Sequence, residues 1–171
     1  MARAALEQLD LEKVLWMPTG KPRYRDAPAA AAEHRVAMLR LALEGEPAFE
    51  IDARELSPGA SAYTVDTLHE LRLELGRSTT LVLVIGADQF EKLGGWHRPD
   101  EVKRLARIAV VKRPGFDKKI DRNVLRIEMR PMPVSASDIR ARVANGEDIG
   151  ALVPPAVVAY IREHGLYRLP S

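Results

Sequence analysis

A segment near the C-terminal end of the chain combines hydroxyl side chains, a helix start and an arginine. In residues 133–140, PVSASDIR, Ser135 or Ser137 can cap a helix, and Asp138 suits its first turn. Free backbone N–H groups and the positive end of the helix dipole attract anions at such a start. Arg140 follows one turn later, and its planar guanidinium matches phosphate oxygens. The segment therefore predicts either an ordinary capped helix or a site for a polyphosphate.

A second candidate site follows residues 81–85, LVLVI, the most apolar run of the chain. Gly86 comes next and lets a ligand approach the backbone closely. Asp88 could accept hydrogen bonds from a base or ribose, or help to hold a metal ion. It could equally cap a short helix that runs through Leu93. The pattern leaves the nucleotide-binding and the capping interpretation open.

Aromatic residues follow a Gly94-Gly95 turn in the same region. Trp96 offers a flat face for stacking an aromatic ring or a cation, although a tryptophan often belongs to the core. Its place after a glycine turn favours the stacking role. His97 is positioned to take part in binding, whereas the other histidines lie in helical segments and are interpreted as structural. These are His34, His69 and His164.

Further polar residues lie where other elements begin or end. Thr64, after Tyr63, suits a helix N-cap, and the start of that helix could also bind a phosphate. Residues 20–25, GKPRYR, form a basic loop in which Lys21 could hold a phosphate or simply be solvated. Arg113, in an Arg-Pro-Gly segment, is placed in the same way.

Composition restricts the class of protein. The chain has 171 residues, 46% of them hydrophobic and none of them cysteine, which predicts one domain over 1–171 without disulfides or thiolate metal sites. Its 26 Lys and Arg nearly cancel 24 Asp and Glu, so the net charge of +2 favours neither nucleic acid nor membrane as a partner. No apolar run could span a bilayer, and Glu7, Asp10 and Glu12 interrupt any signal sequence. We expect a soluble cytoplasmic protein.

The predicted elements alternate along the chain. Strands are expected at residues 14–17, 49–52, 81–85, 108–111 and 126–129. Helices are expected at residues 2–9, 30–43, 64–75, 137–144 and 155–164, with a short one between 88 and 93. Strands alternating with helices indicate an α/β fold whose parallel sheet is covered on both faces. Such sheets bind ligands at the carboxyl ends of their strands, where the candidate residues lie.

Several short motifs together resemble one family. They are Ser61-Ala-Tyr-Thr64, Ile85-Gly-Ala-Asp-Gln89, Trp96-His97-Arg98, Arg113-Pro-Gly115, Ser135-Ala-Ser-Asp-Ile-Arg140, Leu152-Val-Pro-Pro155, Tyr160-Ile161 and Gly165-Leu-Tyr167. In this order they resemble bacterial nicotinate-nucleotide adenylyltransferase, an enzyme of NAD biosynthesis, over essentially the whole chain. The resemblance implies a Rossmann-like nucleotidyltransferase fold. It also implies transfer of AMP from ATP to nicotinate mononucleotide, with release of pyrophosphate and with Mg²⁺ as cofactor.

The resemblance also implies roles for the candidate residues. Those expected to contact ATP are Ser135, Ser137, Ile139 and Arg140 at the phosphates, and Gly86 and Asp88 at the adenosine. Those expected to hold nicotinate mononucleotide are Tyr63, Thr64, Trp96, His97, Lys21 and Arg113. Catalysis would then consist of positioning and of stabilising phosphate charge, by Arg140 and Ser135, with no side chain of the protein ligating a metal.

The chain departs from the family pattern at its start. The family begins with a strand and a His-x-Gly-His loop that contacts phosphates, whereas Met1 falls in the helix that should follow. We therefore expect a domain truncated at its N-terminus, without its first strand, with an opened sheet edge and reduced activity and stability. The basic loop also replaces a Pro-Pro-His-Lys-like segment.

Rival functions remain open from the sequence. The acceptor could instead be nicotinamide mononucleotide or phosphopantetheine. A protein without the histidine loop could also bind nucleotides without catalysis. An electrostatic RNA binder has little support from the small net charge.

Overall fold

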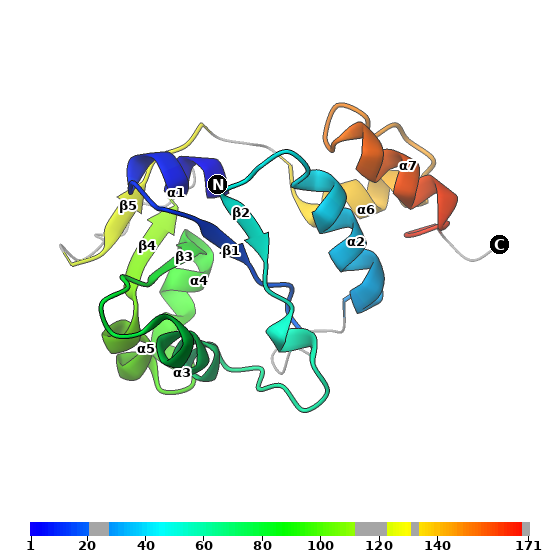
Figure 1. Ribbon diagram of the computed structural model, residues 1–171. Helices are drawn as coiled ribbons and strands as arrows, with labels where there is room; N and C mark the ends of the chain where they lie inside the picture. Colours follow the sequence, from blue (N-terminus) through cyan, green and yellow to red (C-terminus); the bar gives the residue numbers. More distant parts are fainter. Residues whose placement is uncertain (21–27, 112–122, 131–133, 169–171) are drawn as a thin grey trace. The chain divides into compact units, whose positions relative to one another are not determined.

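The computed structural model describes residues 1–20, 28–111, 123–130 and 134–168 (Figure 1). The chain divides into two compact units, and each is described by itself. The first comprises Met1–Val14 and Ser61–Pro131, and the second comprises Leu15–Ala60 and Met132–Ser171. That residues 1–171 form one nucleotidyltransferase-like domain stays a prediction. No helix in the described ranges is long and apolar enough to cross a membrane.

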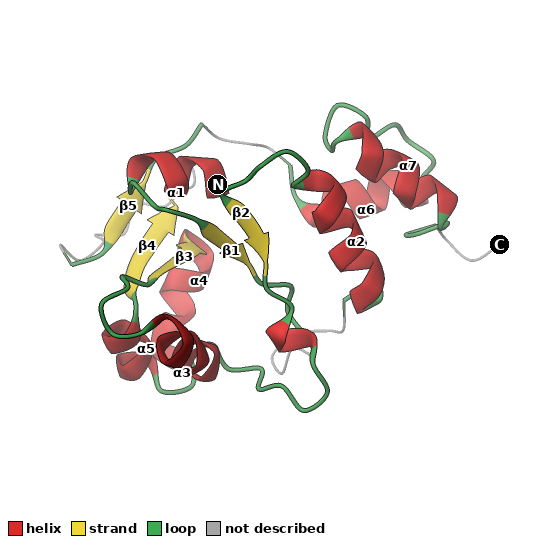
Figure 2. Cartoon of the chain, viewed as in Figure 1, coloured by secondary structure: helices red, strands yellow, loops and turns green. Residues whose placement is uncertain are grey.

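The first unit is built on a parallel sheet of three strands in the order β3-β4-β5 (Figure 2). These strands are β3 (Val82–Gly86), β4 (Arg107–Val111) and β5 (Leu125–Ile127). The register pairs Val82 with Arg107 and Ala109 with Leu125. The predicted parallel sheet is confirmed, with strand ends shifted by one or two residues.

Both faces of this sheet are buried, as the unbroken apolar runs predict. Along β4, Ile108 and Val110 point into one core, and Ala109 and Val111 point into another. The first core is covered by α3 (Thr64–Leu75), α4 (Ala87–Lys92) and α5 (Pro99–Leu105). The second is covered by α1 (Ala2–Gln8), on the opposite side of the sheet in Figure 1. Successive side chains along a strand point to opposite faces of the sheet. A strand that is buried on both faces must therefore be apolar at nearly every position.

Helix α1 is attached to the sheet by one buried alanine and one amide. Ala5 is completely buried against the sheet. The Gln8 side-chain amide donates to the Glu128 carbonyl oxygen at 2.6 Å and accepts from the Glu128 N–H at 2.9 Å. This pair of bonds imitates one rung of strand pairing just beyond β5.

Helix α5 was not predicted, although its sequence carries the signals. Pro99 occupies the first turn with acidic residues, and Lys103 and Arg104 occupy the last turn. The helix has only seven residues, too few for its apolar spacing to show. Its Glu101 side chain lies 3.0 Å from His69 Nε2 on α3, which agrees with a structural role for that histidine.

Arg72 joins the loop after α3 to the end of α5. Its guanidinium donates to the carbonyl oxygens of Gly76 at 3.1 Å and Thr79 at 2.6 Å. It also donates to the carbonyl of Leu105 at 2.7 Å. One side chain therefore joins its own loop to a backbone carbonyl 33 residues further along the chain.

We expect Arg72→Met to lower the free energy of unfolding by about 2 kcal/mol, because charge-assisted bonds to backbone carbonyls are lost, including the partly buried one to Leu105. Urea unfolding followed by circular dichroism measures this change. Arg77→Met, at an exposed position in the same loop, serves as control and should stay within about 0.5 kcal/mol of the wild type. Equal losses in both variants would contradict the role of Arg72.

The second unit pairs a two-stranded sheet with a group of helices. The sheet consists of β1 (Val14–Trp16) and β2 (Phe49–Ile51), followed by the 3₁₀ turn η1 (Arg54–Leu56). The helices are α2 (Ala32–Ala42), α6 (Ala136–Ala144) and α7 (Pro155–Glu163). All lie within about two residues of the predicted bounds.

The helices of the second unit share one apolar core. Its buried members are Ile149, Val157, Val158 and Ile161, and α2 and α6 pack Met38 and Ile139 against them. At the α2–α7 contact, His34 Nδ1 lies 3.0 Å from the Tyr160 hydroxyl oxygen, and the Tyr160 ring stacks on His164. These contacts agree with the structural interpretation of both histidines.

Candidate functional site

The start of α6 is a complete capping box. The Ser135 hydroxyl oxygen accepts from the Asp138 N–H at 3.1 Å, and the Asp138 carboxylate accepts from the Ser135 N–H at 3.1 Å. Of the two candidate caps, Ser135 is therefore the one used. Ala136 and Ser137 occupy the first two helical positions, whose N–H groups have no acceptor inside a helix. The cap and an anion site are compatible, because the cap leaves these donors free of intrahelical bonds.

Hydrogen bonds from the Ser135 side chain and backbone hold the pKa of Asp138 below its ordinary value. Arg142 lowers the pKa further, and partial desolvation opposes the shift. Since the folded pKa is depressed, the capping box stabilises α6 above the ordinary pKa. That stabilisation is lost as the pH falls through the folded pKa.

We expect the Asp138 carboxyl to titrate with a midpoint below 3.8 in carbon-detected NMR. In Ser135→Ala the midpoint should return toward that ordinary value, because the Ser135 hydroxyl, which donates to the Asp138 carboxylate at 2.7 Å, is removed while the backbone N–H bond remains. Ser137→Ala is the matched control, since the Ser137 hydroxyl contacts the Ser135 hydroxyl at 3.1 Å and not the carboxylate. An unchanged midpoint in Ser135→Ala would exclude the bond from the Ser135 hydroxyl as the main cause.

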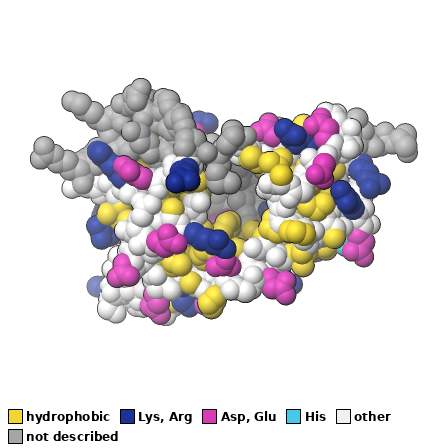
Figure 3. Space-filling model, turned by 90° about the horizontal axis from the view of Figure 1, so that it is seen from above, with side chains coloured by type: hydrophobic (Ala, Val, Ile, Leu, Met, Phe, Trp, Pro, Cys, Tyr) yellow, Lys and Arg dark blue, Asp and Glu magenta, His cyan; other side chains and the backbone are white. Residues whose placement is uncertain are grey.

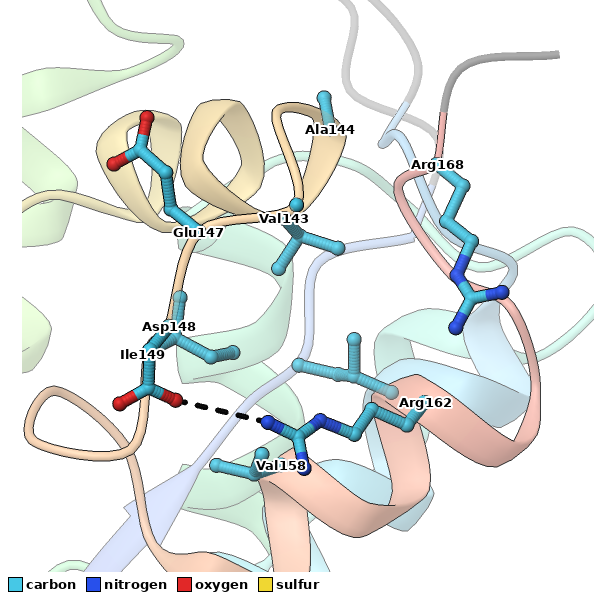
Figure 4. A pocket seen from close by; sticks show the side chains of 10 residues that line it. Val143, Ala144, Glu147, Asp148, Ile149, Val158, Arg162 and Arg168 are labelled. Carbon is cyan, nitrogen blue, oxygen red and sulfur yellow. Dashed lines mark ion pairs between the residues drawn. The ribbon is translucent and has the colours of Figure 1, made fainter. Parts of the chain in front are cut away.

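A surface hollow lies at the opposite end of α6 (Figure 4). It has a volume of about 450 Å³, and Val143 and Val158 line its apolar part. The Asp148 carboxylate and the Arg162 guanidinium pair across it at 3.6 Å, with side chains 76% and 68% exposed. None of the predicted site residues lines this hollow.

Gly86 and Asp88 are placed together at the end of β3. Gly86 is the last residue of the strand and the N-cap of α4, with an ordinary φ of −73°. A Cβ atom at Gly86 would lie 2.7 Å from Asp88 Oδ1, the end of a flexible side chain that can move aside. Asp88 is the second residue of α4 and not its N-cap, so the capping interpretation was wrong. The carboxylate lies beside the glycine backbone at the carboxyl end of the strand.

An aromatic pair packs against the core of the first unit. The Tyr63 and His97 rings stack with centroids 4.2 Å apart and planes at 29°. Tyr63 and Trp96 are both partly buried and pack against the core that contains Ile85. Trp96 is thus in contact with the core while keeping some exposed surface. The structure brings these three predicted residues to one side of the sheet.

The start of α3 corrects one prediction. Thr64 is the first helical residue, the N-cap is Tyr63, and no side chain caps it. Ser61 organises the start instead, because its hydroxyl accepts from the Tyr63 N–H at 3.2 Å and donates to the Asp66 carboxylate. The signal for Ser61 was a serine followed by an acidic residue in the first turn of the helix.

Two predicted residues, Lys21 and Arg113, lie outside the described residues. The others form two groups that belong to different units: residues 63, 64, 86, 88, 96 and 97 to the first, and residues 135–140 to the second. Figure 3 shows acidic and basic side chains interspersed over one face, as the small net charge implies.

The fold and the sequence both match known proteins. A model of the cytidylyltransferase-like family matches residues 1–142. The solved structure of a nicotinic acid mononucleotide adenylyltransferase from Plasmodium falciparum, complexed with NaAD, aligns with this chain. The alignment covers 96% of this chain and 90% of that one. Its TM-score is 0.75 at 18% identity. These matches confirm the Rossmann-like fold of parallel strands flanked by helices.

The sequence relatives identify a narrower family than the family model does. The probable nicotinate-nucleotide adenylyltransferase of Pseudomonas putida (strain W619) is 39% identical over 194 residues, covering 99% of this chain and 89% of that protein. The protein of the same name from Laribacter hongkongensis (strain HLHK9) is 40% identical over 193 residues, covering 100% and 88%. At this identity, over nearly the full length of both chains, the protein belongs to the nicotinate-nucleotide adenylyltransferase family.

Proposed function

We propose that this chain transfers the adenylyl group of ATP to nicotinate mononucleotide in NAD biosynthesis. The observation that carries the proposal is the identity of 39–40%, over nearly the whole chain, to proteins named for this activity. The mononucleotide phosphate oxygen attacks the α-phosphorus of ATP, and the bond between that phosphorus and the bridging oxygen breaks. Deamido-NAD forms, and pyrophosphate leaves.

The start of α6 is proposed to bind the phosphates of ATP. Its first N–H groups lie outside intrahelical bonding, and Ser137 adds a hydroxyl. Arg140 supplies a guanidinium that no carboxylate pairs with in the described part of the chain. Charge that develops on phosphate oxygens during the transfer is stabilised by such fixed donors, which is the main contribution protein makes to this chemistry.

The end of β3 is proposed to bind the nucleosides. Gly86 admits the adenosine close to the backbone, and the adjacent Asp88 carboxylate accepts hydrogen bonds from it. Trp96 stacks on the nicotinate ring, while Tyr63, His97 and Thr64 help to hold the mononucleotide. The Tyr63–His97 stack supports this role, because it supplies an aromatic surface for a nucleotide ring. Trp96 directly precedes His97 in the sequence. Lys21 and Arg113 are proposed to assist at its phosphate.

Membership of an ATP-using nucleotidyltransferase family indicates a divalent cation, and we propose Mg²⁺. In the described residues, no three His, Asp or Glu side chains converge on a point that could hold a metal. This fits Mg²⁺ that arrives with ATP, since phosphates and waters then supply most of its ligands. The ion would neutralise phosphate charge, and Arg140 would do so from the protein side.

The test is release of pyrophosphate by the purified chain from ATP and nicotinate mononucleotide. We expect turnover, and a kcat/KM at least about tenfold lower when nicotinamide mononucleotide replaces the acceptor, because the site is built for one ring substituent. Calorimetry with ATP runs in parallel. ATP binding without pyrophosphate release from either acceptor would refute catalysis and favour a nucleotide-binding protein. Equal rates with both acceptors would refute the nicotinate preference.

A further inference from the structure

Arg35 carries a buried donor without an acceptor. It lies on α2, and its side chain is partly buried. Its Nε atom is shielded from solvent, and no atom of the described residues accepts a hydrogen bond from it. Buried N–H donors are nearly always paired, because leaving water without a new partner is unfavourable. Since the described residues supply no acceptor, this guanidinium donor is available to a bound anion.

Arg35 shares its surroundings with Arg140 and Tyr167. Met38, one turn after Arg35, packs in the same apolar core as Ile139 and Tyr167. Burial raises the pKa of Tyr167, and the charges of Arg140 and Arg35 partly oppose that rise. Both guanidiniums therefore lie close enough to act on one phenol, although they come from helices about 100 residues apart in sequence.

Arg35 and Arg140 have no counter-charge among the described residues. In the described ranges, no carboxylate forms an ion pair with either Arg35 or Arg140, whereas Arg142 on α6 and Arg162 on α7 are paired. Two like charges that share a partly desolvated site repel each other. A bound anion with several charges removes the repulsion and supplies the missing acceptors. Phosphate oxygens match guanidinium donors in geometry as well as in charge.

We propose that Arg35 is a second phosphate-binding residue, which holds the polyphosphate of ATP together with Arg140. This inference rests on the proposed function, in which Arg140 contacts that polyphosphate. Tyr167 completes the site: its phenol remains protonated at neutral pH and can donate to a phosphate oxygen. Arg35 thereby contributes to substrate binding from a helix that carries no recognisable phosphate motif.

Calorimetry of the full chain with inorganic tripolyphosphate and, separately, with adenosine tests the inference. Arg35→Met should weaken tripolyphosphate binding about tenfold and leave adenosine binding unchanged. Arg35→Lys, which keeps the charge but not the planar fork, should weaken it about threefold. Arg40→Met is the matched control, because Arg40 is exposed on the same helix. Its tripolyphosphate affinity should stay within about twofold of the wild type.

A purely structural role predicts a different result. It predicts that Arg35→Met lowers the thermal midpoint and leaves the tripolyphosphate affinity unchanged. An unchanged affinity would overturn the inference, whatever the midpoint. If Arg35→Met does not fold, the Arg35→Lys variant tests the inference instead. A tripolyphosphate affinity of Arg35→Lys equal to that of the wild type would then overturn the inference. Absence of pyrophosphate release by the wild type would count against the proposed function alone, since tripolyphosphate binding needs no turnover.

Discussion

Arg140→Ala is expected to reduce kcat/KM for ATP about 100-fold or more, with little change in stability. The residue is in the second turn of α6, where its guanidinium has no ion-pair partner in the described ranges. Removing one fixed donor that stabilises developing oxyanion charge costs about 100- to 1000-fold in acyl transfer, and we expect a loss of similar size here. Steady-state pyrophosphate release with both substrates varied measures the effect, and it should fall mainly on kcat.

The neighbouring arginine is the control for this experiment. Arg142 lies on the same helix, two residues later, and its guanidinium pairs with the Glu147 carboxylate at 3.5 Å. Because this ion pair is half-exposed, Arg142→Ala should change kcat/KM less than about threefold. Equal effects of the two substitutions would mean that general loss of positive charge, and not the position of Arg140, is responsible.

Gly20→Ala is expected to lower the free energy of unfolding by about 3 kcal/mol. Gly20 follows β1, and a Cβ atom there would lie 2.1 Å from the carbonyl oxygen of Glu55 in η1. The obstacle is backbone, so it cannot rotate away as a side chain would. The β1–η1 contact must therefore open, and urea unfolding measures the loss.

Gly94→Ala provides the matched control for the glycine experiment. No atom lies within 4 Å of a Cβ placed at Gly94, and its φ is not positive. We expect a change of no more than about 0.5 kcal/mol. A Gly20→Ala variant as stable as Gly94→Ala would show that the chain after β1 moves freely away from Glu55.

The sequence predicted the elements well where the signal was local. Helix α3 occupies the predicted bounds, Thr64–Leu75, because an apolar stripe and a terminal glycine define it. β3 and β4 were recognisable because both of their faces must be apolar. Helix α5 was missed because seven residues show no helical period.

The candidate site was predictable in part. Ligands bind at the carboxyl ends of parallel strands, and this rule identifies Gly86, Asp88 and Trp96 as candidates from the sequence alone. That the Asp88 carboxylate lies beside Gly86, and that Tyr63 stacks on His97, depends on side-chain placement in the folded chain. The binding roles of these residues stay predictions.

The sequence by itself determined the class of fold, the family and the segments that carry its motifs. Each of these depends on residue types and on spacing along the chain. Only the tertiary structure showed that Gly20 faces the Glu55 carbonyl, and that Arg35 and Arg140 act on the same phenol. Such relations join residues far apart in sequence, and burial and charge act through space once packing has brought the helices together.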